Sequence, residues 1–301
     1  GAGGDDPAVT TQPAAPVTAP SARAEPVELA LGYRATWAPP GFSERIRQLS
    51  AGEPDDGFGP SLMRVWTKSL KQGDPWGGPE LSLYVRTEVP DPAKAMDTSG
   101  QKVDVNGAVG FYTGAPDAPK SYVTWAPGEH TALILAAGNL DISRSDLLRM
   151  ARSVRADTGV TASPVRLNWL PPGWITSGAT VSGQSPDRWR TDVYAVRRAL
   201  DPSSKLDKER AVREQGDLSV VVDDVTDAPA GGETFTVGGR PARHPVRADE
   251  AGKSLIYLVV DLGGGRLMTL AGHGAGLTLD DLRRVAEQVE ITPSGLGWLG
   301  R

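Results

Sequence analysis

The side chains that most often carry catalysis and metal binding are scarce in this chain of 301 residues. It has no cysteine, which excludes disulfides, zinc–thiolate sites and a thiol nucleophile. Three histidines remain, His130, His244 and His273, and none has the spacing of an HExxH or HxH metal motif. We therefore expect ordinary strand and loop histidines, and we predict neither a metal nor a cofactor.

Adjacent acids and one glycine-rich turn are the next candidates for chemistry. The acid pairs are Asp55-Asp56, Asp223-Asp224 and Asp280-Asp281. Glycosidases need two carboxyl groups that face each other across a cleft, whereas adjacent acids at a strand end or helix start are usually solvated. Residues Gly272–Gly276 precede an expected helix and could bind an anion, but they lack the GxGxxG spacing. We favour a flexible strand-to-helix connection there.

No motif supplies a hydrolytic nucleophile. The GxSxG motif does not occur in the chain, so we predict that the protein is not an enzyme, with an envelope hydrolase as the weakest alternative. The net charge of −5 and the pI near 5.4 argue against a nucleic-acid partner, which requires a basic face.

The chain is rich in tryptophan, with eight residues, and these side chains are candidates for contact with a partner. Trp76 lies in the loop-like segment Asp-Pro-Trp-Gly-Gly-Pro, and Trp298 lies in a tail beyond the last expected helix. Amphipathic aromatic side chains in loops are good anchors for partners. We predict Trp76 and Trp298 as partner contacts, and we expect Trp37 and Trp169 in the core.

An internal repeat determines how these residues are positioned. Four blocks recur in the same order, 132 to 137 positions apart: Trp37–Phe42 with Trp169–Trp174, Val105–Gly107 with Val237–Gly239, Glu80–Val85 with Asp217–Val222, and Ser143–Val154 with Thr278–Val289. The sequence therefore predicts two tandem copies, residues 28–158 and 163–293, joined at Thr158–Pro164. Residues 294–301 form a C-terminal tail.

The same order of strands and turns is predicted for both copies. A strand enters the Pro-Pro-Gly turn, and strands follow at Ser61–Ser69 and Glu80–Glu88 in copy one and at Trp189–Arg198 and Asp217–Asp223 in copy two. Asn106-Gly107 and Gly238-Gly239 are two-residue hairpin turns. A second hairpin covers Tyr122–Trp125 and His130–Ala136 in copy one, with Ser254–Leu262 and Arg266–Ala271 in copy two. Residues Asp201–Gln215 read as an insertion, either a surface helix or a long loop.

Both copies end in an amphipathic helix. Ser143 with Asp146, and Thr278 with Asp281, are capping signals that precede a stripe of apolar residues. We expect these helices to cover the sheets. The predicted fold class is therefore α+β: two tandem repeats, each an antiparallel sheet covered on one face by a C-terminal helix.

Residues 1–27 have the composition of a spacer, with five prolines and seven alanines and no hydrophobic period. The chain begins without methionine, and a removed transmembrane helix or a lipoprotein signal ending in cysteine is the expected upstream element. A disordered tail on a cytosolic protein is the alternative. We predict contact with a membrane only through such a removed anchor.

The motifs of the repeat resemble an uncharacterised extracytoplasmic module of actinobacterial anti-sigma factors and envelope lipoproteins. The resemblance rests on Ala38–Phe42, Val105–Gly107, Trp125 and Leu147–Val154. Copy two keeps Leu170–Trp174 and Leu282–Val289, but has Gly-Gly for Asn-Gly and replaces Trp125 with a residue in Ile256–Val259. These motifs are short and structural, and the module brings no catalytic residues.

The resemblance implies a non-enzymatic extracytoplasmic binding or sensory domain, tethered to the outer face of the cytoplasmic membrane. The partner would be an unknown protein or envelope ligand. The alternative is a lipoprotein carrier of an apolar ligand, which requires an unfilled pocket between sheet and helix.

Overall fold

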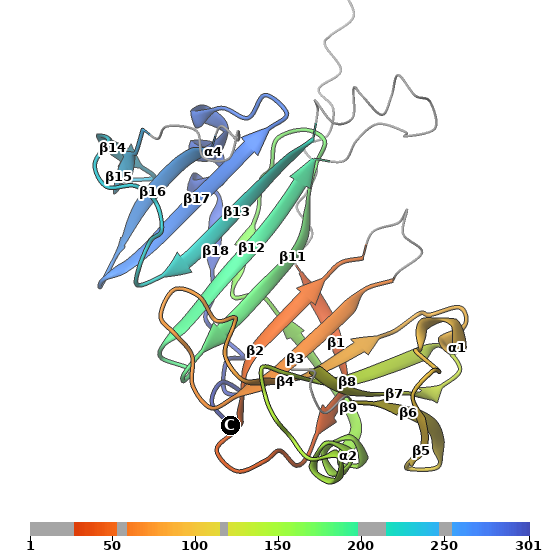
Figure 1. Ribbon diagram of the computed structural model, residues 1–301. Helices are drawn as coiled ribbons and strands as arrows, with labels where there is room; N and C mark the ends of the chain where they lie inside the picture. Colours follow the sequence, from red (N-terminus) through yellow and green to blue (C-terminus); the bar gives the residue numbers. More distant parts are fainter. Residues whose placement is uncertain (1–26, 53–58, 115–119, 198–214, 247–254) are drawn as a thin grey trace, which may run out of the picture.

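One antiparallel sheet organises the molecule, as the computed structural model shows (Figure 1). The structure describes residues 27–52, 59–114, 120–197, 215–246 and 255–301. Among these residues, fourteen strands lie in the order β14-β15-β16-β17-β13-β12-β11-β2-β3-β4-β8-β7-β6-β5. Two further ribbons pair β1 with β9 and β10 with β18. We call residues 27–162 the first half and residues 163–301 the second half.

The elements of the first half are β1 (Glu28–Ala35), β2 (Ser43–Ser50), β3 (Ser61–Thr67), β4 (Glu80–Arg86), α1 (Pro92–Ala95), β5 (Gln101–Val105), β6 (Ala108–Thr113), β7 (Lys120–Gly128), β8 (Thr131–Gly138), α2 (Arg144–Arg152) and β9 (Val154–Ala162). Those of the second half are β10 (Val165–Leu167), β11 (Trp174–Gly183), β12 (Trp189–Arg197), β13 (Gly216–Asp223), β14 (Glu233–Val237), β15 (Arg240–His244), β16 (Ile256–Gly263), β17 (Arg266–Gly274), α4 (Leu279–Glu287) and β18 (Val289–Ile291).

The predicted α+β class is wrong, because the described residues are 53% strand and 9% helix. Strand β2 of the first half pairs with β11 of the second, so that the two expected sheets are one. The helices α2 and α4 have nine residues each, or about 14 Å of length at 1.5 Å per residue. Seven strands at about 4.8 Å spacing span about 29 Å, so neither helix can cover its half of the sheet. The β1–β9 ribbon contacts β3 and β4 beside α2.

The pairing of β2 with β11, which we call the seam, has a regular register. Gln48 lies opposite Thr180, which is 132 positions later in the chain. Each seam strand also has a bulge toward its other neighbour, at Arg45 in β2 and at Ser177 in β11, again 132 positions apart. Outward from the seam, β2-β3-β4-β8-β7-β6-β5 has the same connectivity as β11-β12-β13-β17-β16-β15-β14. The duplication stays a prediction, and this is the topology that a duplicated chain would have.

A close approach at the seam requires glycine. A Cβ built on Gly178 would lie 2.4 Å from the carbonyl oxygen of Leu49 on the neighbouring strand. No side chain fits at that distance, so the backbone of the seam depends on this residue.

One hydrophobic core crosses the seam. Eight directly paired residues, each at most 2% exposed, run across eight strands on one face of the sheet: Val85, Leu62, Leu49, Ala179, Val193, Val220, Leu270 and Leu258. We call this the core face and the opposite side the outer face. The helices and both ribbons contribute to the same cluster of buried residues, so the two halves share one core.

The helix and hairpin predictions are confirmed as local elements. Ser143 caps α2, and Thr278 with Asp281 forms a capping box at α4. Asn106 and Gly107 have φ of 53° and 88°, the left-handed values that a tight hairpin turn requires. The counterpart of Trp125 in strand pairing is Val260, one residue beyond the predicted interval.

Equivalent arginine–tryptophan contacts join each helix to its half. The guanidinium of Arg149 in α2 lies 4.1 Å from the ring centre of Trp37, and that of Arg284 in α4 lies 4.4 Å from Trp169. Trp169 is buried and Trp37 is half-buried. The predicted join, Thr158–Pro164, lies in β9 and in the short connection to β10. The predicted spacer, apart from Val27, lies outside the described residues, as does Asp201–Gln215 apart from Gln215.

Candidate binding site

A loop of the first half reaches across the seam to the second half. We call Lys68–Pro79, between β3 and β4, the 70s loop (Figure 1). Gln184, in the turn between β11 and β12, donates from Nε2 to the carbonyl oxygen of Leu70 at 3.1 Å. At the loop tip, Gly73 has φ of 84° and lies against Val225, which follows β13. The 70s loop therefore belongs to the first half by sequence and to both halves by contact.

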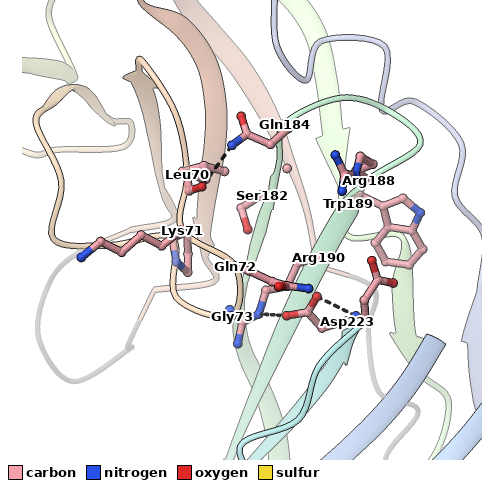
Figure 2. A pocket seen from close by; sticks show the side chains of 13 residues that line it. Leu70, Lys71, Gln72, Gly73, Ser182, Gln184, Arg188, Trp189, Arg190 and Asp223 are labelled. Atoms are coloured by element: carbon pink, nitrogen blue, oxygen red, sulfur yellow. Dashed lines mark hydrogen bonds and ion pairs between the residues drawn. The ribbon is translucent and has the colours of Figure 1, made fainter. Parts of the chain in front are cut away.

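A pocket of about 230 Å³ lies under this loop (Figure 2). Its walls are the 70s loop, the β11–β12 turn with the start of β12, and the end of β13. We call it the junction pocket. It opens to solvent and its lining is mostly polar, so it is unlike the apolar pocket of an acyl chain.

The acids of the junction pocket are each paired with an arginine. Asp223 Oδ2 lies 3.0 Å from Arg190 Nε, and Asp223 Oδ1 accepts the backbone N–H of Asp224 at 2.7 Å (Figure 2). Arg266 lies 2.8 Å from Asp224 Oδ1 and stacks on the ring of Trp189 at 4.5 Å. The pair Asp223-Asp224 is thus held by two arginines, rather than facing across a cleft as a catalytic pair requires.

Two cations at the rim of the pocket lack this compensation. Lys71 on the 70s loop and Arg188 before β12 are both exposed, and neither forms an ion pair with another described residue. Asp187 is exposed in the same turn and does not line the pocket. The rim can therefore attract and hydrogen-bond a negatively charged group.

The structure places Trp76 beside this site, on the loop that forms one wall, although Trp76 itself does not line the pocket. It is half-buried on the 70s loop, next to the buried Pro75 that lines the pocket. The backbone N–H of Trp76 donates to Asp74 Oδ1 at 3.0 Å, a local turn that fixes this part of the loop. Its role as a partner contact stays a prediction.

Trp298 lies on a tail that folds back onto β2. The guanidinium of Arg47 is 4.1 Å from its ring centre, so one ring face is occupied by the protein itself. Gly300 N–H donates to the carbonyl oxygen of Glu44 at 2.8 Å, and the N–H of Glu44 donates to that of Arg301 at 2.9 Å. Trp298 is half-buried, and its predicted partner contact also stays untested.

A buried charged cluster beneath Trp298 is not foreseen from the sequence. Glu44 on β2 accepts from Arg64 on β3 at 2.6 and 2.9 Å, and from Arg47 at 3.0 and 3.2 Å. Arg64 also donates to Asp157 and to the carbonyl oxygen of Tyr33 in the β1–β9 ribbon, at 3.0 and 2.8 Å. Glu44, Arg47 and Arg64 are 4–5% exposed. This cluster fixes the ribbon and the tail to the sheet.

The charges of the cluster lower the pKa values of its two carboxylates, Glu44 and Asp157. Burial alone would raise the pKa of Glu44, but the hydrogen bonds and charges of Arg64 and Arg47 outweigh burial and lower it. The pKa of Asp157 is also lowered, since the N–H of Gly159 and the Arg64 guanidinium outweigh its partial burial. Both carboxylates are therefore held charged in the folded protein.

Asp192 lies on the outer face of β12, and its pKa is raised rather than lowered. Ser219 Oγ lies 2.6 Å from Asp192 Oδ1, and Tyr194 on the same strand lies 3.1 Å from Thr180 Oγ1. Burial raises the pKa of Asp192 to about 6, although the hydrogen bond from Ser219 and the charge of Arg190 act in the other direction.

We expect Asp192 to make the protein less stable as the pH rises from about 4 to about 6. In this range the unfolded chain loses the Asp192 proton while the folded protein still binds it, so the free energy of unfolding falls by about 1–3 kcal/mol. Asp192→Asn removes this dependence and is more stable than the wild type near pH 7. Urea unfolding across this range measures the effect, with the exposed Asp187→Asn as the control. An unchanged pH profile in Asp192→Asn would contradict the assignment.

The remaining candidates from the sequence form no centre among the residues that the structure describes. The Nδ1 atoms of His130 and His244 lie against backbone carbonyl oxygens at 3.2 and 2.8 Å, and His273 Nδ1 lies 2.7 Å from Asp217. Within the described ranges, no three metal-binding side chains gather. Asp55 and Asp56 lie outside those ranges, and Gly272–Gly276 forms the end of β17 and the turn into α4. No described helix is long and apolar enough to cross a membrane.

Comparison with known proteins assigns the chain to no family. No family model and no curated protein matches it. Two solved structures show a weak likeness over 83% of this chain. MucB in complex with MucA(peri) is 12% identical, with 94% of its chain covered and a TM-score of 0.23. The MucA/MucB complex of Pseudomonas aeruginosa is 11% identical, with 93% covered and a TM-score of 0.25. These scores are too low to support an argument, so a function must be inferred from the chain's own sequence and geometry.

Proposed function

We propose that the chain is a non-enzymatic binding domain outside the cytoplasm, which recognises a protein partner at the junction pocket. It would act in a membrane-tethered regulator or an envelope lipoprotein, as the ectodomain of an anti-sigma-factor-like protein. The observation that carries the binding role is the 70s loop: it forms a polar pocket together with the second half of the molecule, and it presents Trp76 beside that pocket. The spacer-like composition of residues 1–27 supports the location.

We expect Trp76 to be an anchor for the partner. Trp76→Ala should weaken partner binding at least tenfold, since tryptophan anchors at interfaces contribute about 2 kcal/mol or more. A photoreactive benzoylphenylalanine at position 76 should cross-link one discrete envelope protein in the native host. The same residue at the exposed position Val109, on β6, is the matched control. Equal cross-linking at both positions, or none at position 76, would contradict the proposed site.

The location can be tested separately. Protease added to spheroplasts should degrade the protein while a cytoplasmic marker stays intact. Protection of the protein together with that marker would place it inside the cell and remove the extracytoplasmic role.

A carrier of an apolar ligand is the second candidate, because a hollow of about 310 Å³ lies beside α4, although most of the surface exposed in it is polar. Val237, Val260 and Met268 form part of its lining, and Arg240 and Glu287 are polar members of the same lining. The interface of α4 with the sheet is otherwise filled, with Leu282 and Val285 fully buried. Saturable binding of one fluorescent fatty acid that Val260→Trp abolishes would favour this function over the first.

A further inference from the structure

We infer that the junction pocket takes the carboxylate side chains of an acidic, extended segment of the partner. This inference rests on the proposed function and names the chemistry of the partner. The carrying observation is the unequal pairing of charges: Asp223 and Asp224 are matched by Arg190 and Arg266, which leaves the rim cations without an ion-pair partner among the described residues. The lining of the pocket thus carries three cations and two carboxylates, in a chain with a net charge of −5.

The two rim cations suit carboxylates in different ways. Arg188 carries a planar guanidinium that can bind both oxygens of one carboxylate, whereas Lys71 is a flexible point charge on the 70s loop, and its side chain extends outward in Figure 2. Arg190 and Arg266 are already engaged and hold the base of the pocket in place. Two separate carboxylates, spaced along a peptide, satisfy these walls better than one compact anion.

The size of the pocket favours side chains over a whole small molecule. A volume of about 230 Å³ lies below the range of about 300–1,000 Å³ that is usual for small-molecule sites. It is sufficient for one or two carboxylate side chains whose backbone stays outside. Trp76, on the same loop, would then contact the part of the segment that lies beyond the rim.

The net charge of the chain makes such a site selective. An acidic segment is repelled by a protein of charge −5 except where uncompensated cations face it. The junction pocket therefore fixes both the position and the register of the segment, and its affinity should fall as ionic strength rises.

A peptide panel tests the inference on the whole chain. Three fluorescein-labelled decapeptides share an Ala-Gly-Ser background and carry four Glu, four Gln or four Lys. We expect fluorescence anisotropy to show saturable binding of the Glu peptide alone, weakened by salt. Equal binding of the Gln peptide, or no binding of the Glu peptide, would overturn the inference. Complete displacement by millimolar inorganic phosphate would also overturn it, in favour of a site for a small anion.

Charge reversal locates the binding. Lys71→Glu with Arg188→Glu should weaken the Glu peptide at least tenfold. The control is Lys102→Glu with Lys120→Glu, which changes the net charge equally at exposed positions of β5 and β7 and should leave the affinity within twofold. Thermal unfolding checks that both variants stay folded. Equal loss in the two variants would show general electrostatics rather than a pocket.

Cross-linking at position 76 separates this inference from the proposed function. If the wild-type background captures a partner and the Lys71→Glu, Arg188→Glu background does not, both stand. If both backgrounds capture it equally, the partner site stands and its acidic chemistry is wrong. If neither background captures a protein, the proposed function fails, and the peptide panel alone decides the chemistry of the pocket.

Discussion

Replacing Glu44 with alanine is expected to lower the free energy of unfolding by about 3–5 kcal/mol. Glu44 is the only acceptor among the described side chains that both Arg47 and Arg64 contact, and all three are almost fully buried. Removing it leaves two buried guanidinium groups beside each other, which costs far more than the pair itself contributes. Urea denaturation at neutral pH measures the loss.

Two comparisons sharpen the Glu44 experiment. Glu233→Ala, at an exposed position of β14, should change stability by less than about 0.5 kcal/mol. Because the Glu44 pKa is lowered in the folded protein, the wild type should also lose stability as the pH falls below about 4.5. Part of that loss should be missing from Glu44→Ala. A penalty below about 1 kcal/mol in Glu44→Ala would show that the arginines are solvated after all.

Ending the chain after Ser294 is expected to cost about 4–6 kcal/mol. The removed tail contains Leu296 and Leu299, which are 4% and 2% exposed, and leucine-to-alanine changes at such positions cost about 2–5 kcal/mol each. It also removes the ring over Arg47 and the backbone hydrogen bonds to Glu44.

Single substitutions show how much of this loss in the free energy of unfolding comes from each side chain of the tail. Leu299→Ala should account for about 2–3 kcal/mol, whereas Trp298→Ala should cost about 1 kcal/mol, because its ring is half-exposed and stacks on one cation. Thermal and urea unfolding of the truncated chain, of Leu299→Ala and of Trp298→Ala measure the three losses in stability. If Trp298→Ala costs nothing while the truncation costs several kcal/mol, the tryptophan is free for the partner contact that its position in the sequence predicts.

The sequence predicts features that depend on neighbouring residues and misses those that depend on distant ones. The cap residues Ser143 and Thr278 and the hairpin turn at Asn106 act within a few positions, so their types identify them. The seam strands β2 and β11 are not predicted at all. Strand β2 carries Glu44, Arg45 and Arg47, which lack the alternation of a half-buried strand.

That omission explains the error in fold class. Without β2 and β11, each copy reads as a separate sheet that needs its own helical cover. The charges of β2 are compatible with burial because Arg64 on β3 and Asp157 on β9 complete the cluster, and Asp157 lies far along the chain. The junction pocket cannot be predicted from the sequence for the same reason. Lys71, Arg188 and Asp223 line one pocket because the seam joins the two halves, and no motif links them.

The seam also bears on how such a chain can arise. Strands that occupy corresponding places in the two halves pair antiparallel about Gln48 and Thr180, with their bulges in corresponding positions. A single half would therefore expose a self-complementary edge, able to form a two-fold symmetric homodimer in this same register. Covalent linkage makes that association independent of protein concentration, because each half has its partner at a fixed effective concentration. In a chain that arose by duplication, linkage would also free the two sides of the symmetry axis to diverge, so that the proposed site beside the seam would need to recognise one segment and not two.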